Sequence, residues 1–462
     1  MDTILLAINW GNVGSKTAQL LLSLSILVIL HEFGHYITAK WFKCRVEKFY
    51  LFFDPWFSIL KRKIGDTVYG IGWLPLGGYV KISGMVDESM DKEAMKLPPQ
   101  PWEFRSKPAW QRLIIMLGGV TVNVLLAFFI YAMILFVWGE KKIVNSSLTN
   151  GIYCADSLLL KFGLNNGDKI VAINDKEIKY FDDIPGKLIT ATKVTVEKNG
   201  AQKVIDMPID LIGQLVEKKK QGVGFIEPRR EAFAGDIGDK LFDTSYARKA
   251  GLKYLDKIIS IDSVPVNFVD EIGPLVEKKK NGVVQIGIER NGEKMAIESR
   301  VNNEGKIGLP WVDFDTMDSL GMIKIDAKKY SFFEAFPAGV VKTGEKLGGY
   351  IDQFKKMANP KTGAYKGVGG FKTIGSVFPT PWDWESFWSI TAFLSIILAC
   401  MNLLPIPALD GGHVVFNLAE LISGRKPCDK FLEYAQVVGM VILLSLMLYA
   451  NGNDWFGWGK GR

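Results

Sequence analysis

Two chemically useful residue types are scarce in this chain of 462 residues, and each scarcity excludes a kind of site. The four cysteines are Cys44, Cys154, Cys400 and Cys428. They are scattered along the chain, so neither a disulfide framework nor a Cys-x-x-Cys zinc site is present. Histidine occurs only three times, and two of the three, His31 and His35, are separated by four positions. A site that uses imidazole is therefore expected at this pair.

Basic residues are absent from the first fifteen positions, which contain no Lys or Arg. They gather instead in residues 43–107 and 425–430, beside long hydrophobic runs. By the positive-inside rule, both basic segments are expected on the cytoplasmic side of a membrane, with both termini and residues 139–383 outside. Because these cations flank hydrophobic runs rather than covering one domain, the net charge of +7 does not indicate nucleic-acid binding.

Apolar residues make up 48% of the chain, and the excess lies in four runs long enough to cross a hydrocarbon core. These runs are Lys16–Lys40, Trp110–Trp138, Trp384–Leu404 and Ala435–Ala450. The last run is short, and its flanks would have to help it span. The first has neither a basic leader nor a small-residue cleavage site, so we interpret it as a retained helix rather than a signal peptide.

The long segment after the second run contains an internal repeat. The sequence FGLNNGDKIVAIND (Phe162–Asp175) aligns with AGLKYLDKIISIDS (Ala250–Ser263), and VTVEKNG (Val194–Gly200) aligns with IGIERNG (Ile286–Gly292). Alternating apolar residues predict strands at residues 169–173 and 257–261, and the Asn-Gly pairs predict hairpin turns. The repeated pattern resembles the PDZ domain. That resemblance implies either capture of chain ends by strand addition or a purely scaffolding pair without a ligand.

Two further segments have predictable structure. Asp66–Ser83, with its alternating residues and glycines, predicts strands that form a β-rich loop between the first two runs. Apolar residues from Phe333 to Phe354 recur at helical spacing with lysines between them. This pattern is typical of an amphipathic helix on a membrane surface, and an ordinary packed helix beside the repeat fits it equally well.

The sequence HEFGH (His31–His35) has the spacing of a metal-binding motif. On a helix, His31 and His35 share one face, so both imidazoles can reach one metal ion, with Glu32 on the same turn. Zinc suits nitrogen and oxygen ligands, and Glu32 would then act as general base. A third ligand is expected near the cytoplasmic end of the third run, where Asp410 and His413 are both available. Spacing alone leaves both candidates open.

These motifs resemble those of the site-2 protease family of intramembrane zinc metalloproteases, of the regulator of sigma-E protease type with tandem PDZ domains. The resemblance rests on HEFGH and on NLLPIPALDGG (Asn402–Gly412), and it covers nearly the whole chain. It implies that one Zn²⁺ is held by His31, His35 and Asp410, with Glu32 as the catalytic base. It also implies substrate-binding roles for the following residues: Asn402, Pro405, Pro407, Gly77, Gly78 and Tyr79.

The second run departs from the family pattern at one point. Where the family often has glycine-proline before an asparagine, this chain has GGVTVN (Gly118–Asn123), with Val120 in place of the proline. The change affects helix packing rather than the chemistry. Asn123 is expected to pack between helices rather than to bind substrate.

Together these features predict a multi-pass α-helical membrane protein with four transmembrane helices, two periplasmic β-rich PDZ domains and a membrane-associated β-loop. The expected segments are a first transmembrane helix (1–41), a cytoplasmic-side β-loop and connector (42–109), a second transmembrane helix (110–138), two PDZ domains (139–228 and 229–320), an amphipathic segment (321–383), a third transmembrane helix (384–404), the LDGG loop and a cytoplasmic segment (405–433), and a fourth transmembrane helix with the C-terminus (434–462). The active site is expected near the cytoplasmic side of a bacterial inner membrane.

The function that this pattern predicts is zinc-dependent hydrolysis of single-span membrane proteins within the bilayer. By resemblance, the substrates would be an anti-sigma factor already trimmed by another protease, or signal-peptide remnants. A non-enzymatic PDZ membrane adaptor is one alternative. A metal transporter is another, but it would need polar residues along several spans, and the second and fourth runs carry almost none. Neither alternative accounts for a glutamate directly beside a histidine ligand.

Overall fold

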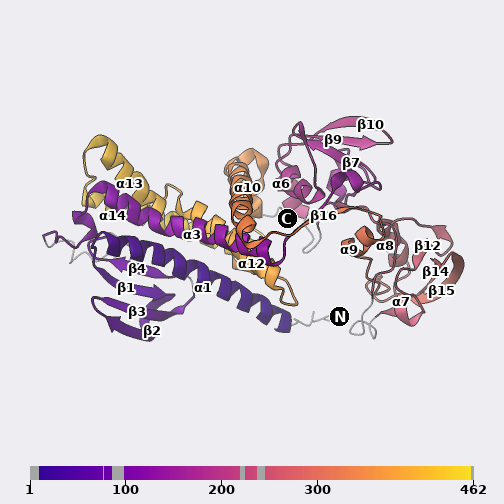
Figure 1. The fold of residues 1–462 in the computed structure, drawn as a ribbon, viewed down its shortest axis with the longest axis horizontal. Coiled ribbons are helices and arrows are strands. Elements are labelled where there is room, and N and C mark those ends of the chain that lie inside the picture. Colours follow the sequence, from indigo (N-terminus) through magenta and orange to yellow (C-terminus); the bar gives the residue numbers. More distant parts are fainter. Residues whose placement is uncertain (1–9, 76, 86–97, 219–223, 237–244, 459–462) are drawn as a thin grey trace. The chain divides into compact units, whose positions relative to one another are not determined.

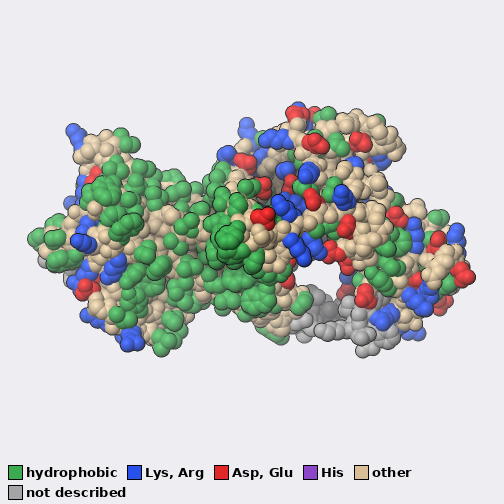
Figure 2. Space-filling view, in the orientation of Figure 1, with side chains coloured by type: hydrophobic (Ala, Val, Ile, Leu, Met, Phe, Trp, Pro, Cys, Tyr) green, Lys and Arg blue, Asp and Glu red, His purple; other side chains and the backbone are tan. Residues whose placement is uncertain are grey.

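The computed structural model describes residues 10–75, 77–85, 98–218, 224–236 and 245–458. The chain folds as two compact units. The first consists of residues 1–139, 329–355 and 366–462, and the second of residues 140–328 and 356–365. Hydrophobic side chains dominate the visible surface of the first unit, whereas charged side chains are scattered over the second (Figure 2).

The first unit is mainly helical (Figure 1). Its helices are α1 (Trp10–Trp41), α3 (Ala109–Val137), α10 (Phe332–Ala358), α11 (Phe371–Ser376), α12 (Trp384–Asn402), α13 (Asp410–Ser423) and α14 (Asp429–Phe456). Within the described ranges, α1, α3, α12 and residues 430–456 are long and apolar enough to cross a membrane. These are the four predicted runs, so the chain is consistent with a membrane protein. The fourth helix extends beyond Ala435–Ala450 at both ends, because its flanks continue the helix.

Helix α3 is central to the first unit, and α1, α12 and α13 all pack against it. It approaches α1 closely because glycines face each other, and a Cβ atom on Gly34 would overlap the backbone of Gly118. Small residues at a helix crossing permit such close approach in membrane proteins. Helix α12 is joined to α3 by a buried hydrogen bond, in which the Ser395 hydroxyl donates to the Asn123 carbonyl oxygen at 2.8 Å.

A four-stranded sheet lies beside α1 (Figure 1). Its strands are β1 (Val46–Leu51), β2 (Phe53–Ile64), β3 (Thr67–Leu74) and β4 (Tyr79–Ile82), in the order β2-β3-β1-β4. The predicted strands within 66–83 are confirmed as β3 and β4, whereas β1 and β2 were missed. Most of the predicted connector after β4, residues 86–97, lies outside the described residues. Among the described strands, β4 pairs only with β1, so its other edge has no strand partner.

The second unit contains two small sheets of the same design. The strands are β5 (Glu140–Ile143), β6 (Ile152–Tyr153), β7 (Lys169–Ile173), β8 (Lys176–Glu177), β9 (Lys193–Lys198), β10 (Ala201–Asp206), β11 (Glu227–Pro228), β12 (Lys257–Ile261), β13 (Val264–Pro265), β14 (Val283–Arg290), β15 (Glu293–Arg300) and β16 (Ile325–Lys328). The helices are α4 (Ser157–Lys161), α5 (Ile184–Leu188), α6 (Leu211–Lys218), α7 (Tyr246–Lys249), α8 (Val269–Glu277) and α9 (Phe314–Ser319).

The repeat seen in the sequence is confirmed by the strand order. The first sheet runs β10-β9-β7-β8 and the second β13-β12-β14-β15, so each repeat places its central strand between a short strand and a hairpin. The predicted strands 169–173 and 257–261 are β7 and β12. Asn199-Gly200 and Asn291-Gly292 form the hairpin turns, and all four residues have positive φ, as a type I′ turn requires.

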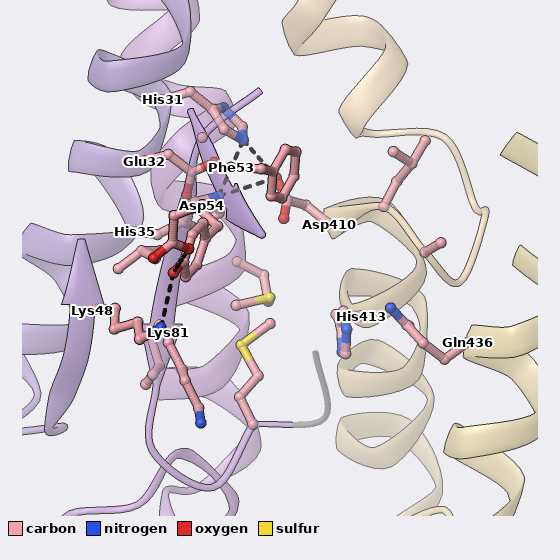
Figure 3. A pocket seen from close by; sticks show the side chains of 18 of the residues that line it. His31, Glu32, His35, Lys48, Phe53, Asp54, Lys81, Asp410, His413 and Gln436 are labelled. Carbon is pink, nitrogen blue, oxygen red and sulfur yellow. Dashed lines mark hydrogen bonds and ion pairs between the residues drawn. The ribbon is translucent and has the colours of Figure 1, made fainter. Parts of the chain in front are cut away.

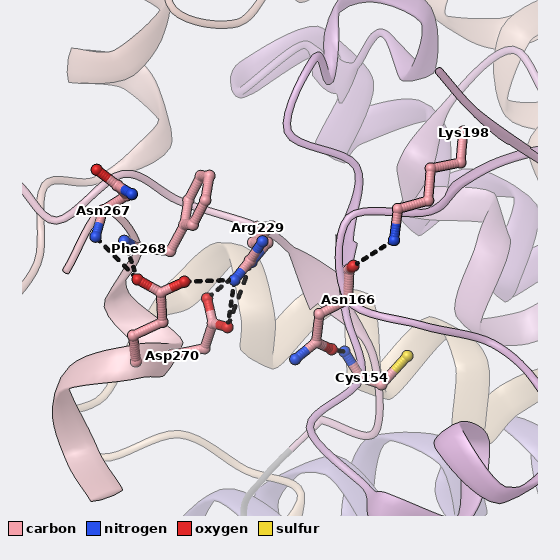
Figure 4. A network of polar contacts seen from close by, with 8 residues as sticks. Cys154, Asn166, Lys198, Arg229, Asn267, Phe268 and Asp270 are labelled. Atoms are coloured by element: carbon pink, nitrogen blue, oxygen red, sulfur yellow. Dashed lines mark hydrogen bonds and ion pairs between the residues drawn. The ribbon is translucent and has the colours of Figure 1, made fainter. Parts of the chain in front are cut away.

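The two repeats are joined by a charged contact (Figure 4). The guanidinium of Arg229 donates to both carboxylate oxygens of Asp270 and, at 2.9 Å, to Glu271. It also lies 3.8 Å from the ring centroid of Phe268. The two carboxylates thus accept hydrogen bonds from several N–H groups of one planar guanidinium, as in bidentate arginine contacts. The second unit therefore holds its two sheets together through a specific contact at residue 229.

The predicted amphipathic helix is present as α10, which contains Pro337 in its second turn. Its exposed apolar residues include Phe333, Val340 and Val341. A Cβ atom on Gly339 would meet the backbone of Ala132 at 2.9 Å, so the start of α10 lies against α3.

Candidate metal centre

Three side chains of metal-ligating type converge in the first unit (Figure 3). His31 and His35 project from the same face of α1 and are buried, with 7% and 4% of their surface exposed. Asp410 is the first residue of α13. The turn before it is tight, because a Cβ atom on Gly411 would overlap the backbone of Leu403 and Leu404. Glycine at 411 thus lets the chain turn back and bring Asp410 to α1.

The separations of the ligand atoms fit a single metal ion. The Nε2 atoms of His31 and His35 are 3.3 Å apart, and Asp410 Oδ2 lies 3.2 Å from the first and 3.1 Å from the second. In tetrahedral zinc sites, bonds of about 2.0–2.2 Å place any two ligand atoms about 3.3–3.6 Å apart, so the observed separations lie at the short end of what one ion requires. The donor set of two imidazoles and one carboxylate is also that of a catalytic zinc site. The residues therefore fit zinc in chemistry and in spacing.

The orientation of His35 is set by its second ring nitrogen. Its Nδ1 atom lies 2.9 Å from the carbonyl oxygen of Ile115 on α3. A carbonyl oxygen only accepts hydrogen bonds, so Nδ1 carries the proton and Nε2 of the neutral ring has a free electron pair. That electron pair points at the other two ligand atoms, as a metal ligand's should.

His31 is held between two amide side chains. The Nδ2 atom of Asn123 lies 3.1 Å from Nδ1, and the Nδ2 atom of Asn402 lies 3.0 Å from Nε2. Asn123 is fully buried between helices, as predicted, but it also contacts a candidate ligand. The spacing in the sequence is consistent with this contact. Asn123 follows Gly119 by four residues, so on a helix the two lie on one face, and this is the face of α3 that packs on α1.

Of the two candidates for the third ligand, Asp410 is the one that lies within reach of both histidines. His413 lies one turn further along α13 and lines the neighbouring cavity, but it is not a member of the ligand cluster. Burial raises the pKa of the Asp410 carboxyl, but the nearby His35 and His31 outweigh burial and hold that pKa below its ordinary value. Asp410 is thus a carboxylate, the form that ligates metal.

A cavity of about 560 Å³ opens beside the ligand cluster. One wall consists of β4 and the start of β2, the back consists of α1, and the opposite wall consists of α13 and α14 (Figure 3). Glu32 lines this cavity, and the backbone N–H of Val80 hydrogen-bonds its carboxylate. The Glu32 carboxylate therefore lies beside both the metal-ligand cluster and β4.

Polar groups occur on both walls of the cavity. On the β-sheet wall, Tyr79 donates from its hydroxyl to Asp54 at 2.7 Å, and Lys48 donates to the Tyr79 hydroxyl at 3.2 Å. On the opposite wall, Gln436 of α14 is only 4% exposed. No hydrogen bond to its amide occurs among the residues that the structure describes, so the amide can pair with a bound molecule.

Of the six residues expected to bind substrate, two line the cavity and four do not. Gly78 and Tyr79 line the cavity, and a Cβ atom on Gly78 would lie 3.4 Å from Cγ of Glu32. The other four expected residues are Gly77, Asn402, Pro405 and Pro407, and none of them is among the cavity-lining residues. Asn402 instead contacts His31 directly.

Comparison with known proteins gives a family match over most of the chain. The model of peptidase family M50 matches residues 19–446. The regulator of sigma-E protease RseP of Escherichia coli (strain K12) is 26% identical over 461 residues, which cover 95% of this chain and 97% of the relative.

Other curated relatives are similar over comparable lengths. A protein of Campylobacter jejuni, Cj1068, is named as a zinc metalloprotease and is 28% identical, covering 94% of this chain and 91% of its own length. A protein of Treponema pallidum (strain Nichols), also named as a zinc metalloprotease, is 25% identical, covering 93% of this chain and 96% of its own length. The matched range contains all three members of the ligand cluster.

Proposed function

Because the chain belongs to peptidase family M50, we propose that it cleaves single-span membrane proteins within the bilayer, using the cluster around His31. The family match and the relatives establish a site-2-type metalloprotease that uses zinc. In our proposal His31, His35 and Asp410 hold one zinc ion and Glu32 is the general base. The observation that carries this assignment is the spacing of the three ligand atoms, 3.1–3.3 Å, directly beside Glu32.

Each residue of the cluster has a defined task. A bound zinc ion would supply Lewis-acid polarisation of the scissile carbonyl and of the attacking water. Glu32, next to the first ligand and facing the cavity, accepts the proton of the attacking water and returns it to the leaving amine. Ile115 holds His35 through its carbonyl oxygen, so the ring does not rotate away from the site.

The substrate must be extended before it can be cleaved. The carbonyl groups of a transmembrane helix are hydrogen-bonded within the helix, so a helical segment offers no accessible peptide bond. The β4 edge without a strand partner lines the cavity beside Glu32, and an unwound segment that takes over the Val80 N–H from Glu32 can add to that edge as a further strand. On the opposite wall, the Gln436 amide offers one donor side and one acceptor to the substrate backbone.

Substrate choice and orientation are also part of the proposal. The name of the E. coli relative supports substrates of the anti-sigma-factor kind, and signal-peptide remnants would be a second group. We propose an inner-membrane location, with both termini and the second unit in the periplasm and the metal cluster near the cytoplasmic side. The two similar sheets of the second unit, proposed as tandem PDZ domains, would exclude substrates whose outer domains are intact.

The decisive experiment compares the full chain with Glu32→Gln in liposomes. Both receive single-span peptides without outer domains, and bound zinc is measured in each. We expect the wild type to cleave, and the variant to retain zinc while losing cleavage by at least about a hundredfold. Absence of zinc from both proteins would remove the metal assignment and leave the adaptor alternative. Unchanged cleavage by Glu32→Gln would show that another residue is the base.

A further inference from the structure

The buried amide of Asn123 faces a ring nitrogen that cannot be a hydrogen-bond acceptor if His31 binds a metal through Nε2. A neutral imidazole carries one proton, on Nδ1 or on Nε2. If Nε2 is the ligand atom, as its distances of 3.3 Å and 3.2 Å from the other two ligand atoms indicate, the proton must be on Nδ1. Nδ1 is then a donor, and the group opposite it must accept.

In the structure, the Asn123 amide turns its nitrogen, a donor, toward His31 Nδ1, which would itself be a donor. Its Nδ2 atom faces His31 Nδ1 at 3.1 Å, and its Oδ1 atom is buried without a hydrogen-bond partner. The two ends of an amide side chain have nearly the same shape, so their assignment is decided by the hydrogen bonds they make. Rotating the amide by half a turn brings Oδ1 to the ring, where it accepts the proton on Nδ1.

Asn402 strengthens this conclusion. Its Nδ2 atom faces the other ring nitrogen of His31, Nε2, at 3.0 Å. With both amides as placed, both ring nitrogens would have to accept, which a neutral ring cannot do. One amide must therefore turn its oxygen to the ring, and Asn123 is the one that faces Nδ1, the nitrogen that carries the proton when Nε2 is the ligand atom.

We propose that Asn123 is a positioning residue for the metal centre: its side-chain oxygen accepts the Nδ1 proton of His31 and thereby keeps Nε2 unprotonated and aimed at the ion. The inference rests on the proposed metal role of His31. On this proposal, α3 holds the Nδ1 atoms of both histidines, since Ile115 contacts His35 and Asn123 contacts His31. Ile115 and Asn123 lie eight residues apart on one helix face. Outer partners of this kind typically change metal affinity by about 10–100-fold.

The placement of Asn123 is well fixed. Its side chain is fully buried, and its backbone oxygen accepts the Ser395 hydroxyl at 2.8 Å, which joins α3 to α12 at this residue. The contact to His31 is therefore built by helix packing rather than by a mobile loop.

The test uses two substitutions of opposite chemistry in the full-length protein. Asn123→Leu has the same number and branching of side-chain heavy atoms but no acceptor, and Asn123→Asp has two acceptor oxygens and no donor. Zinc retention is measured by competition with a chromophoric chelator. We expect Asn123→Leu to lose zinc about 10–100-fold more readily than the wild type, and Asn123→Asp to retain zinc as well as the wild type or better.

Comparing the two variants shows whether the Asn123 side chain accepts a hydrogen bond from His31 or donates one to it. If the amide donates to His31, aspartate fails as leucine does, and that result would overturn the proposal. Wild-type zinc retention by Asn123→Leu would also overturn it. Asn417→Leu on α13 is the matched control, because Asn417 is a buried amide, 3% exposed, that is not a member of the ligand cluster.

A second readout addresses the proton directly. With ¹⁵N-labelled histidine, a chain with only three histidines gives few signals, and the chemical shift of each ring nitrogen reports whether it is protonated. We expect one residue, assigned to His31 by its loss in His31→Ala, to carry its proton on Nδ1 in the wild type and in Asn123→Asp. A proton on Nε2 would refute the inference even if the chain binds zinc, whereas failure of the wild type to bind zinc would refute the proposed function instead.

Discussion

Gly119 on α3 lies directly against the imidazole of His35, and a Cβ atom on this glycine would overlap the Nε2 atom of that ring. The same Cβ atom would lie 2.8 Å from Nδ1 of His31. The backbone of α3 thus forms one side of the candidate metal centre, and only a residue without a side chain fits at position 119 in this packing.

Gly119→Ala is therefore expected to damage the metal centre. The added methyl group must displace one or both rings, and such overpacking costs about 1–3 kcal/mol in well-packed interiors. We expect zinc retention and peptide cleavage each to fall by at least about tenfold. Gly344→Ala on α10 is the matched control, because a methyl group there would meet no atom within 4 Å and the variant should keep wild-type values. Normal zinc retention in Gly119→Ala would contradict the close packing.

Gly78→Ala is expected to separate substrate binding from metal binding. A Cβ atom there would lie 2.7 Å from both the Tyr50 carbonyl oxygen and Cγ1 of Val28 on α1, so it would shift the start of β4 away from α1, the helix that carries Glu32. We expect kcat/KM to fall about tenfold while bound zinc stays at the wild-type level. Gly14→Ala on α1, where a methyl group meets no atom within 4 Å, serves as control. Loss of zinc together with activity would argue against a role in substrate alignment.

Gln436→Leu tests the opposite wall of the cavity. Because the buried amide has no hydrogen-bond partner among the described residues, its loss leaves no protein group there unpaired. If it pairs with the substrate backbone, kcat/KM should fall about three- to tenfold, as expected for one neutral hydrogen bond. Zinc retention should not change. Val437→Ala, a substitution at an exposed neighbour on α14, should leave both quantities unaltered, and equal kinetics for Gln436→Leu and the wild type would exclude the contact.

Cysteine reactivity reports on the fold of the second unit. Burial, and to a smaller extent Asp168, raise the pKa of the Cys154 thiol to about 12, so very little thiolate exists at pH 8. Cys428, by contrast, is exposed. At pH 8 we expect a maleimide to label Cys428 rapidly and Cys154 only after denaturation, as read by mass spectrometry of proteolytic fragments. Rapid labelling of Cys154 in native Cys428→Ser would show that the first sheet does not bury it.

The sequence predicted those parts of the molecule that depend on local spacing. His31 and His35 were found because a separation of four places two side chains on one helix face, and β7 and β12 were found because alternating residues predict a strand. Spacing alone leaves Asp410 and His413 both open, since their separation from residue 31 in sequence contains no information about distance in space. The prediction of Asp410 came from the family resemblance, and the structure brings Asp410 to the histidines through the turn at Gly411, where two backbone segments meet.

Other features could not be predicted because they arise from packing between distant segments. Strand β2 was missed because Phe53–Ile64 joins an apolar stretch to a basic one without alternation, and 12 residues are long for a strand. The contact of Asn123 with His31 was missed because it bridges two helices 92 positions apart in sequence. An amide in an apolar helix predicts some polar partner but does not identify it.

The ligand cluster joins distant parts of the chain, since Asp410 meets His35 across 375 positions. After His35, a ribosome must therefore add 375 further residues before the proposed third ligand exists. A product that ends before residue 410, through premature termination or proteolysis, lacks that ligand. On the proposed mechanism, such a fragment could insert its first helices in the membrane without being able to cleave its neighbours there.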